Sequence, residues 1–257
     1  MKVVLLAGGK GTRLAEETHL RPKPMVEIGG RPILWHIMKI YSHYGFNDFI
    51  ICLGYKGEII KEYFLNYAMH NSHMTVNMES NEVITHKKYH EPWKVTLVDT
   101  GEESMTGGRL RRIREFVGQN PCMVTYGDGV GDVDIRALVD THLKYKRKAT
   151  LTAVYPPARF GALDIDQTNV IQAFKEKPEG DGSFINGGFF VLEPSVLEMI
   201  TSDSCIFEQD ILPKLSEEKE LVAFKHKGFW LPMDTLRDKI NLENLWEKKK
   251  APWKLWQ

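Results

Sequence analysis

Two cationic side chains near the N-terminus have the types and neighbours that phosphate chemistry needs. Arg13 carries a planar guanidinium that can bind a phosphate through two parallel hydrogen bonds, and Lys23 carries a compact ammonium. Pro22 and Pro24 flank Lys23 and restrict the backbone that carries it. This placement favours a binding role for Lys23, and the alternative is an ordinary solvated lysine.

Two aspartates further along the chain are candidate ligands of Mg²⁺, which prefers oxygens from one or two carboxylates, phosphates and water. Asp128 follows the apolar run 122–126 and lies between two glycines, where a carboxylate can meet a ligand without crowding. The alternative for Asp128 is a turn-forming aspartate. Asp234 precedes Thr235 and could instead cap a helix that starts there. From the residues alone, the cap is the stronger interpretation of Asp234.

The stretch before Arg13 predicts a buried strand followed by a phosphate-binding turn. Residues 3–7 are apolar, and Gly8, Gly9 and Gly11 predict a turn made mainly of backbone, whose free N–H groups suit phosphate oxygens. The stretch is not a dinucleotide fingerprint, because Leu14 stands where the third glycine belongs, and it lacks the ending of a Walker A loop. A nicotinamide-dependent dehydrogenase is therefore disfavoured, and a tight turn without a ligand is the structural alternative.

The elements that must position these groups alternate along the first part of the chain. Apolar residues at helical spacing predict a helix over 31–44, which Gly45 ends. A buried strand over 49–54 and a second helical pattern over 58–68 follow. This alternation indicates a parallel sheet covered by helices, with a nucleotide site at the carboxyl end of the first strand.

Residues 70–100 break the alternation and predict an inserted excursion in which only 95–99 is clearly a strand. From about residue 156 short β-like runs dominate, up to residue 192. We expect a single domain over 1–257, with a core over 1–155 and a β-rich portion over 156–257. The remaining expected elements are helices over 110–117, 134–145 and 236–248 and strands over 122–126 and 149–155.

Composition and charge exclude several classes of function. Lysine plus arginine equals aspartate plus glutamate at 34 each, so no global field favours nucleic acid or an anionic membrane as a partner. Cys52, Cys122 and Cys205 lie far apart and are expected to be reduced core residues. The apolar run at the N-terminus is too short for a signal peptide or a membrane span. We therefore expect a soluble, cytoplasmic protein.

Several motifs together resemble the sugar-1-phosphate nucleotidyltransferases. The first are "LAGGKGTRL" and "RPKPM", and the likeness continues in order through "YGDG", "FGAL", "EKP", "NGGFFVL" and "MDT". Other stretches are closer still to members that transfer a cytidylyl group from CTP to glucose 1-phosphate, namely "HEPWKVTLVDTG", "SMTGGRL", "GFWLPMDTLRDK" and "KAPWK". The product of those members, CDP-glucose, feeds the synthesis of dideoxy sugars of surface polysaccharide such as O-antigen.

The resemblance implies an α/β fold with a Rossmann-like, mostly parallel (mixed) sheet flanked by helices, and a sugar-binding role for the β-rich portion. It implies CTP and glucose 1-phosphate as substrates, Mg²⁺ as cofactor and a homo-oligomer. A sugar phosphate is already an anionic nucleophile near pH 7, so the reaction needs cations and in-line positioning rather than a strong base. Arg13, Lys23 and Asp128 are the expected catalytic residues, with Asp128 and Asp234 on the metal.

The remaining site residues also come from the resemblance. Base choice is expected in the loop 104–109 with the backbone of 6–8, and Arg109 reads either the base or a phosphate, unless it is a solvated helix residue. Two alternatives stay open: an enzyme that uses UTP or dTTP, and a nucleotide-sensing relative without catalysis. The nucleotide set is Leu6, Ala7, Gly8, Gly9, Lys10, Gly11, Thr12, Arg13, Lys23, Ser104, Arg109, Gly127 and Asp128; the sugar-phosphate set is Gly161, Glu176, Lys177, Asn186 and Gly187.

Overall fold

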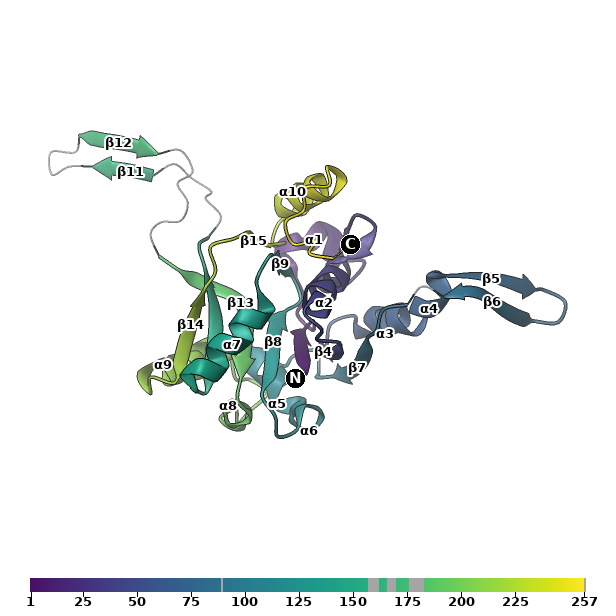
Figure 1. The fold of residues 1–257 in the computed structure, drawn as a ribbon, viewed down its shortest axis with the longest axis horizontal. Helices are drawn as coiled ribbons and strands as arrows, with labels where there is room; N and C mark the ends of the chain where they lie inside the picture. The colour runs from purple at the N-terminus through teal and green to yellow at the C-terminus, as the bar shows by residue number, and fades with distance from the viewer. Residues whose placement is uncertain (89, 157–161, 166–169, 176–182, 257) are drawn as a thin grey trace.

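A seven-stranded mixed sheet forms the centre of the protein in the computed structural model (Figure 1). Its strand order is β14-β10-β13-β8-β1-β4-β7, and only β13 runs antiparallel to its neighbours. The strands are β1 (Val3–Leu6), β4 (Asp48–Leu53), β7 (Lys94–Asp99), β8 (Cys122–Tyr126), β10 (Ala149–Val154), β13 (Ile185–Leu192) and β14 (Leu221–Lys225). The structure describes residues 1–88, 90–156, 162–165, 170–175 and 183–256.

Strand β1 lies between β4 and β8 and is parallel to both. The chain goes from β1 to β4 and β7 on one side, whereas β8 and the later strands add on the other side. Strand order therefore reverses at β1. In open α/β sheets, ligands bind beyond the carboxyl ends of the strands at such a reversal. The predicted fold class and the expected position of the site are both consistent with this arrangement.

Side chains of the central strands alternate between two hydrophobic clusters, one on each face of the sheet. In β1, for example, Val3 and Leu5 lie in one cluster and Val4 in the other. Helices α2, α3, α7 and α10 cover the first face, and α5, α6, α8 and α9 the second. Their bounds are α2 (Ile33–His43), α3 (Gly57–Leu65), α5 (Thr106–Arg112), α6 (Arg114–Val117), α7 (Ile135–Tyr145), α8 (Pro194–Glu198), α9 (Leu212–Glu217) and α10 (Leu236–Glu247).

Two β-hairpins extend from opposite ends of the sheet (Figure 1). The first, β5 (Ser72–Asn77) with β6 (Glu82–Lys88), follows the short helix α4 (Tyr67–His70). The second consists of β11 (Ala162–Ile165) and β12 (Ile171–Lys175). The strand expected over 95–99 is present as part of β7, and β5 and β6 are two further strands in the excursion. They were not clear from the sequence because most of their side chains are exposed and show no apolar pattern.

One helix also differs from its prediction. Instead of a helix over 110–117, α5 begins at Thr106, and α6 starts after a break at Ile113. The glycines at the start of α5 hid it, because glycine has low helix propensity. They are needed there, since a Cβ on Gly108 would lie 2.2 Å from the carbonyl oxygen of Asp203.

The C-terminal segment packs on the core. Trp253 is fully buried and donates a hydrogen bond from Nε1 to Nδ1 of His36 at 3.3 Å. The other nitrogen of His36 bonds the carbonyl of Ile28 at 2.8 Å. The three cysteines are free and buried. Among the described residues, no helix has both the length and the apolar character that a membrane crossing requires.

Candidate active site

A cavity of about 570 Å³ opens at the carboxyl ends of β1 and β8. Its size is within the range of small-molecule sites. It brings together segments that are far apart in sequence: the loop after β1, the Lys23 turn, the start of α5, the end of β8, β13 and the segment before α10. The sequence-predicted residues that line it are Leu6, Ala7, Gly8, Gly9, Gly11, Thr12, Arg13, Lys23, Ser104, Arg109, Gly127, Asp128, Asn186, Gly187 and Asp234.

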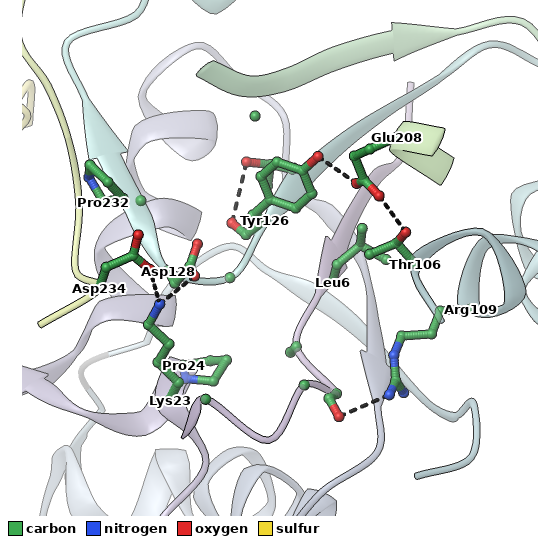
Figure 2. Close-up of a pocket in the computed structure, with 18 of the residues that line it drawn as sticks. Leu6, Lys23, Pro24, Thr106, Arg109, Tyr126, Asp128, Glu208, Pro232 and Asp234 are labelled. Carbon is green, nitrogen blue, oxygen red and sulfur yellow. Dashed lines mark hydrogen bonds and ion pairs between the residues drawn. The ribbon is translucent and has the colours of Figure 1, made fainter. Parts of the chain in front are cut away.

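Lys23 is held in the wall of this cavity by a short 3₁₀ turn, Lys23–Met25. Pro22 has an extended backbone just before the turn. Pro24 fits at the start of the turn, because the N–H group that proline lacks would have no partner within the turn there. Lys23 is only 6% exposed, yet its ammonium reaches the cavity (Figure 2). The prediction that the two prolines fix a functional lysine is consistent with this geometry, and a solvated lysine is excluded.

The two predicted metal ligands meet at this ammonium. Nζ of Lys23 lies 2.7 Å from Oδ2 of Asp128 and 2.7 Å from Oδ1 of Asp234 (Figure 2). A short antiparallel ladder brings the aspartates together, because β9 (Gly129–Gly131) directly follows Asp128 and pairs with β15 (Trp230–Pro232). Residues separated by more than a hundred positions therefore share one ion network.

Asp234 does not cap the helix that follows it. The N-cap of α10 is Thr235, whose side chain and that of Asp238 form a reciprocal capping box. Asp234 is thus free to use both carboxylate oxygens in the cavity, Oδ1 on Lys23 and Oδ2 on Nη1 of Arg13 at 2.7 Å. The cap interpretation of Asp234 is wrong, because Thr235 meets that need.

The donor set of this cluster fits Mg²⁺. The described residues contain no group of three His, Cys, Asp or Glu side chains that could hold a metal by themselves. Mg²⁺ does not require such a cage, since it commonly binds one or two carboxylates and takes its other ligands from phosphates and water. Asp128 and Asp234, which both line the cavity and both contact Lys23, would supply these two carboxylates.

The loop after β1 is shaped by two of its glycines. Gly11 has φ of +64°, in the left-handed region that favours glycine, and the 3₁₀ turn Thr12–Leu14 starts directly after it. Gly8 is required for a close approach, because a Cβ there would lie 2.1 Å from Nη1 of Arg109. At Gly9 no atom lies within 4 Å of such a Cβ, so the backbone faces open space.

Arg109 is neither a solvated arginine nor a free cation. It is 5% exposed, and its guanidinium donates to the carbonyls of Gly8 at 2.9 Å and Gly101 at 2.8 Å. It also bonds the carbonyls of Leu53 and Glu102 and the hydroxyl of Thr100. The solvated alternative is therefore wrong. The contacts show Arg109 joining the loop after β1 to the loop before α5.

A second polar cluster, which the sequence analysis missed, lies on the other side of the cavity (Figure 2). Oε1 of Glu208 accepts a hydrogen bond from the hydroxyl of Tyr126, and Oε2 accepts one from Thr106, both at 2.6 Å. The pKa of Tyr126 is raised, mainly by burial and secondly by the negative charge of Glu208. The phenol therefore keeps its proton and stays a hydrogen-bond donor. No motif marked Glu208, because a glutamate followed by Gln209 and Asp210 has no spacing that distinguishes it from ordinary surface residues.

The sugar-phosphate prediction is only partly within the described residues. Asn186 and Gly187 line the cavity. The side chain of Asn186 accepts from the N–H of Gly188 and donates to the hydroxyl of Tyr126, and the carbonyl of Gly187 accepts from Trp230. The other three predicted residues, Gly161, Glu176 and Lys177, lie outside the described residues.

Lys10, which was predicted to bind the nucleotide, follows Gly9 in the loop after β1 but does not itself line the cavity. Its ammonium pairs with Glu103 at 2.8 Å, and this hydrogen bond raises the pKa of Lys10. The pair joins the loop after β1 to the loop before α5 at an exposed position, so its contribution to stability is small.

Comparison with known proteins places the chain in a family. Residues 2–248 match the family described as nucleotidyl transferase. The chain is 61% identical over 258 residues to glucose-1-phosphate cytidylyltransferase of Salmonella typhi and 40% identical over 257 residues to a probable glucose-1-phosphate cytidylyltransferase of Bacillus subtilis (strain 168). Both alignments cover 100% of each chain.

Solved structures share the fold. The crystal structure of HddC from Yersinia pseudotuberculosis superposes with a TM-score of 0.70 at 25% identity, covering 95% of this chain and 99% of that one. UDP-glucose pyrophosphorylase complexed with UDP-glucose superposes with a TM-score of 0.69 at 16% identity, covering 96% and 98%. The second likeness concerns the fold alone.

Proposed function

Because the chain belongs to the nucleotidyl transferase family, and is related over its full length to the glucose-1-phosphate cytidylyltransferases, we propose that it transfers the cytidylyl group of CTP to α-D-glucose 1-phosphate. The products are CDP-glucose and pyrophosphate. One observation carries the proposal: Arg13, Lys23, Asp128 and Asp234 converge in one cavity at the switch point of the sheet. This arrangement favours an enzyme that joins two anions over the alternative, a nucleotide-sensing relative without catalysis.

The chain's own residues have distinct tasks in this reaction. The backbone of the loop after β1, from Gly8 to Thr12, faces the triphosphate of CTP, with Arg13 on the departing pyrophosphate. Lys23 meets the α-phosphate and the incoming sugar phosphate, where its positive charge lowers their repulsion. The phosphate oxygen of glucose 1-phosphate attacks the α-phosphorus, and the bond from that phosphorus to the bridging oxygen of pyrophosphate breaks. No side chain has to remove a proton, because the nucleophile is already an anion.

Mg²⁺ is the proposed cofactor: Asp128 and Asp234 would hold it, and it would supply positive charge against the phosphate oxygens. In the free protein Lys23 contacts one oxygen of each of these carboxylates. In the complex Lys23 and Arg13 then bond phosphate oxygens instead. The two cations therefore have a counter-charge both before and after the substrates bind.

Base selection is proposed to lie in the loop 104–109 with the backbone of Leu6 to Gly8. Ser104 is buried beside this part of the cavity. Arg109 donates a hydrogen bond to the carbonyl of Gly8. We therefore propose that Arg109 contributes to nucleotide binding by fixing the shape of the loop after β1. On the sugar side, Asn186 and Gly187 are proposed to act with Gly161, Glu176 and Lys177.

The test is to incubate the purified protein with Mg²⁺, glucose 1-phosphate and each of CTP, UTP, dTTP, GTP and ATP, and to follow pyrophosphate release. CTP should give the highest kcat/KM, and omission of the metal should abolish release. A preference for UTP or dTTP would refute the cytidylyl assignment but not the class of reaction. We further propose a cytoplasmic homo-oligomer whose product supplies dideoxy sugars for surface polysaccharide, such as O-antigen.

A further inference from the structure

Glu208 is the third carboxylate of the cavity among the described residues and has no part in the scheme above. Asp128 and Asp234 surround Lys23 on one side, whereas Glu208 lies on the other side with Thr106 and Tyr126 (Figure 2). It belongs to a single π-helical turn, Phe207–Ile211. Such turns occur frequently at functional sites.

Glu208 is held at two points. Thr106 and Tyr126 each donate to a different carboxylate oxygen at 2.6 Å. Both anchors are themselves fixed, because Thr106 accepts from the N–H of Phe207 and Tyr126 accepts from Asn186. The position of the carboxylate is therefore set before any ligand binds, as a preorganised binding group requires.

The charge of Glu208 restricts what it can face. No ion pair of Glu208 with a basic side chain is found within the described chain, so the carboxylate would repel the phosphates. It must then face an uncharged, hydrogen-bond-donating part of a substrate. A carboxylate has about four acceptor positions. Thr106 and Tyr126 use two, which leaves one on each oxygen.

We propose that Glu208 binds a vicinal diol of a substrate, one hydroxyl on each carboxylate oxygen. Both substrates of the proposed reaction carry such a diol, on the ribose of CTP and on the hexose ring. Glu208 lies between the start of α5, which carries Thr106, and β13, which carries Asn186. This inference depends on the proposed reaction only for its substrates, because ligand binding tests it separately.

The experiment combines the variant Glu208→Gln with deoxy analogues of the substrates. Glu208→Gln keeps the shape of the side chain and removes its charge. Equilibrium binding of CTP is compared with that of its 2′-deoxy and 3′-deoxy analogues, and binding of glucose 1-phosphate with that of its 2-, 3- and 4-deoxy analogues. Hydrogen bonds to a charged group predict that the wild type binds the relevant deoxy compound about 10- to 100-fold more weakly. In Glu208→Gln this ratio should fall below about threefold. The substrate for which this affinity ratio falls in Glu208→Gln is the one whose diol Glu208 binds.

Two variants separate binding from structure. Tyr126→Phe removes one anchor but keeps the charge, so it should weaken the same ratio only in part. Glu217→Gln makes the same change at an exposed position of α9 and should leave every ratio unchanged. The inference is overturned if Glu208→Gln discriminates against all deoxy analogues as the wild type does. It is also overturned if Glu208→Gln alters only the preference for CTP over UTP, since the carboxylate would then face the base.

Discussion

Replacing Lys23 by methionine should make the protein bind a divalent cation more tightly in the absence of nucleotide, although turnover falls. In the free protein the ammonium lies 2.7 Å from one oxygen of Asp128 and 2.7 Å from one oxygen of Asp234, in the position between them. A metal that binds these two oxygens would have to displace it. Methionine keeps the length and apolar contacts of the stem but cannot compete for the oxygens.

The size of the effect follows from these contacts. A hydrogen bond to a charged group contributes about 1.5–3 kcal/mol, and Lys23 makes one to each aspartate. If the displaced ammonium recovers half of this in water, removing it tightens metal binding by about 1.5–3 kcal/mol, or about 10- to 100-fold.

Titration of Mn²⁺, followed by the electron paramagnetic resonance signal of the free ion, measures this affinity without substrates. Turnover of Lys23→Met should meanwhile fall by about two to three powers of ten, as for the loss of one preorganised donor. Lys39→Met is the matched control, because Lys39 also forms a partly buried pair, with Glu91 at 2.8 Å, away from the cavity. Equal Mn²⁺ affinity in wild type and Lys23→Met would refute the competition. A near-wild-type rate would show that Lys23 is not catalytic.

Three further predictions concern the framework of the site. Gly8→Ala should lower the free energy of unfolding by about 1–3 kcal/mol, because its methyl group would meet the Arg109 guanidinium, whereas Gly9→Ala should leave the urea midpoint unchanged. Arg109→Met should cost at least about 2 kcal/mol in the same assay and weaken CTP binding, because several buried carbonyls lose their donor. Burial lowers the pKa of His36 to about 4, so the unfolded chain binds more protons between that value and about 6.5. Stability should therefore fall by about 3 kcal/mol as the pH drops through this window, and His36→Leu should show a smaller fall in urea titrations at pH 7 and pH 4.5.

The sequence predicted the parallel part of the fold because its signal is local. Strands such as β1 and β8 are buried on both faces and read as unbroken apolar runs, and α2 and α7 show helical spacing. Hairpin β5–β6 has neither pattern, since most of its side chains are exposed. The start of α5 was missed for a different reason: its glycines are set by contact with residues 203–205, which are distant in sequence.

The same distinction applies to the site. Lys23 and Asp128 were found because their neighbours, prolines and glycines, leave a local mark. The contacts that Asp234 and Arg109 make could not be predicted from their neighbours in the sequence. Asp234 is free to bind Lys23 only because Thr235 caps α10, and Arg109 is buried only because its helix lies against the loops it bonds. Glu208 depends on Tyr126 and Thr106, neither of which is near it in sequence.

The charges of the phosphate end indicate why metal and nucleotide should bind together. Arg13 and Lys23 balance Asp128 and Asp234, so the free cluster carries no net charge and gains little from a metal or a nucleotide alone. A bare metal would displace two cations that then lack partners, and a bare triphosphate would draw those cations away from two carboxylates. With both ligands bound, Asp128 and Asp234 would have the metal as their partner, and Arg13 and Lys23 would have the phosphates. Since such coupling is reciprocal, CTP should tighten metal binding by the same factor as the metal tightens CTP binding.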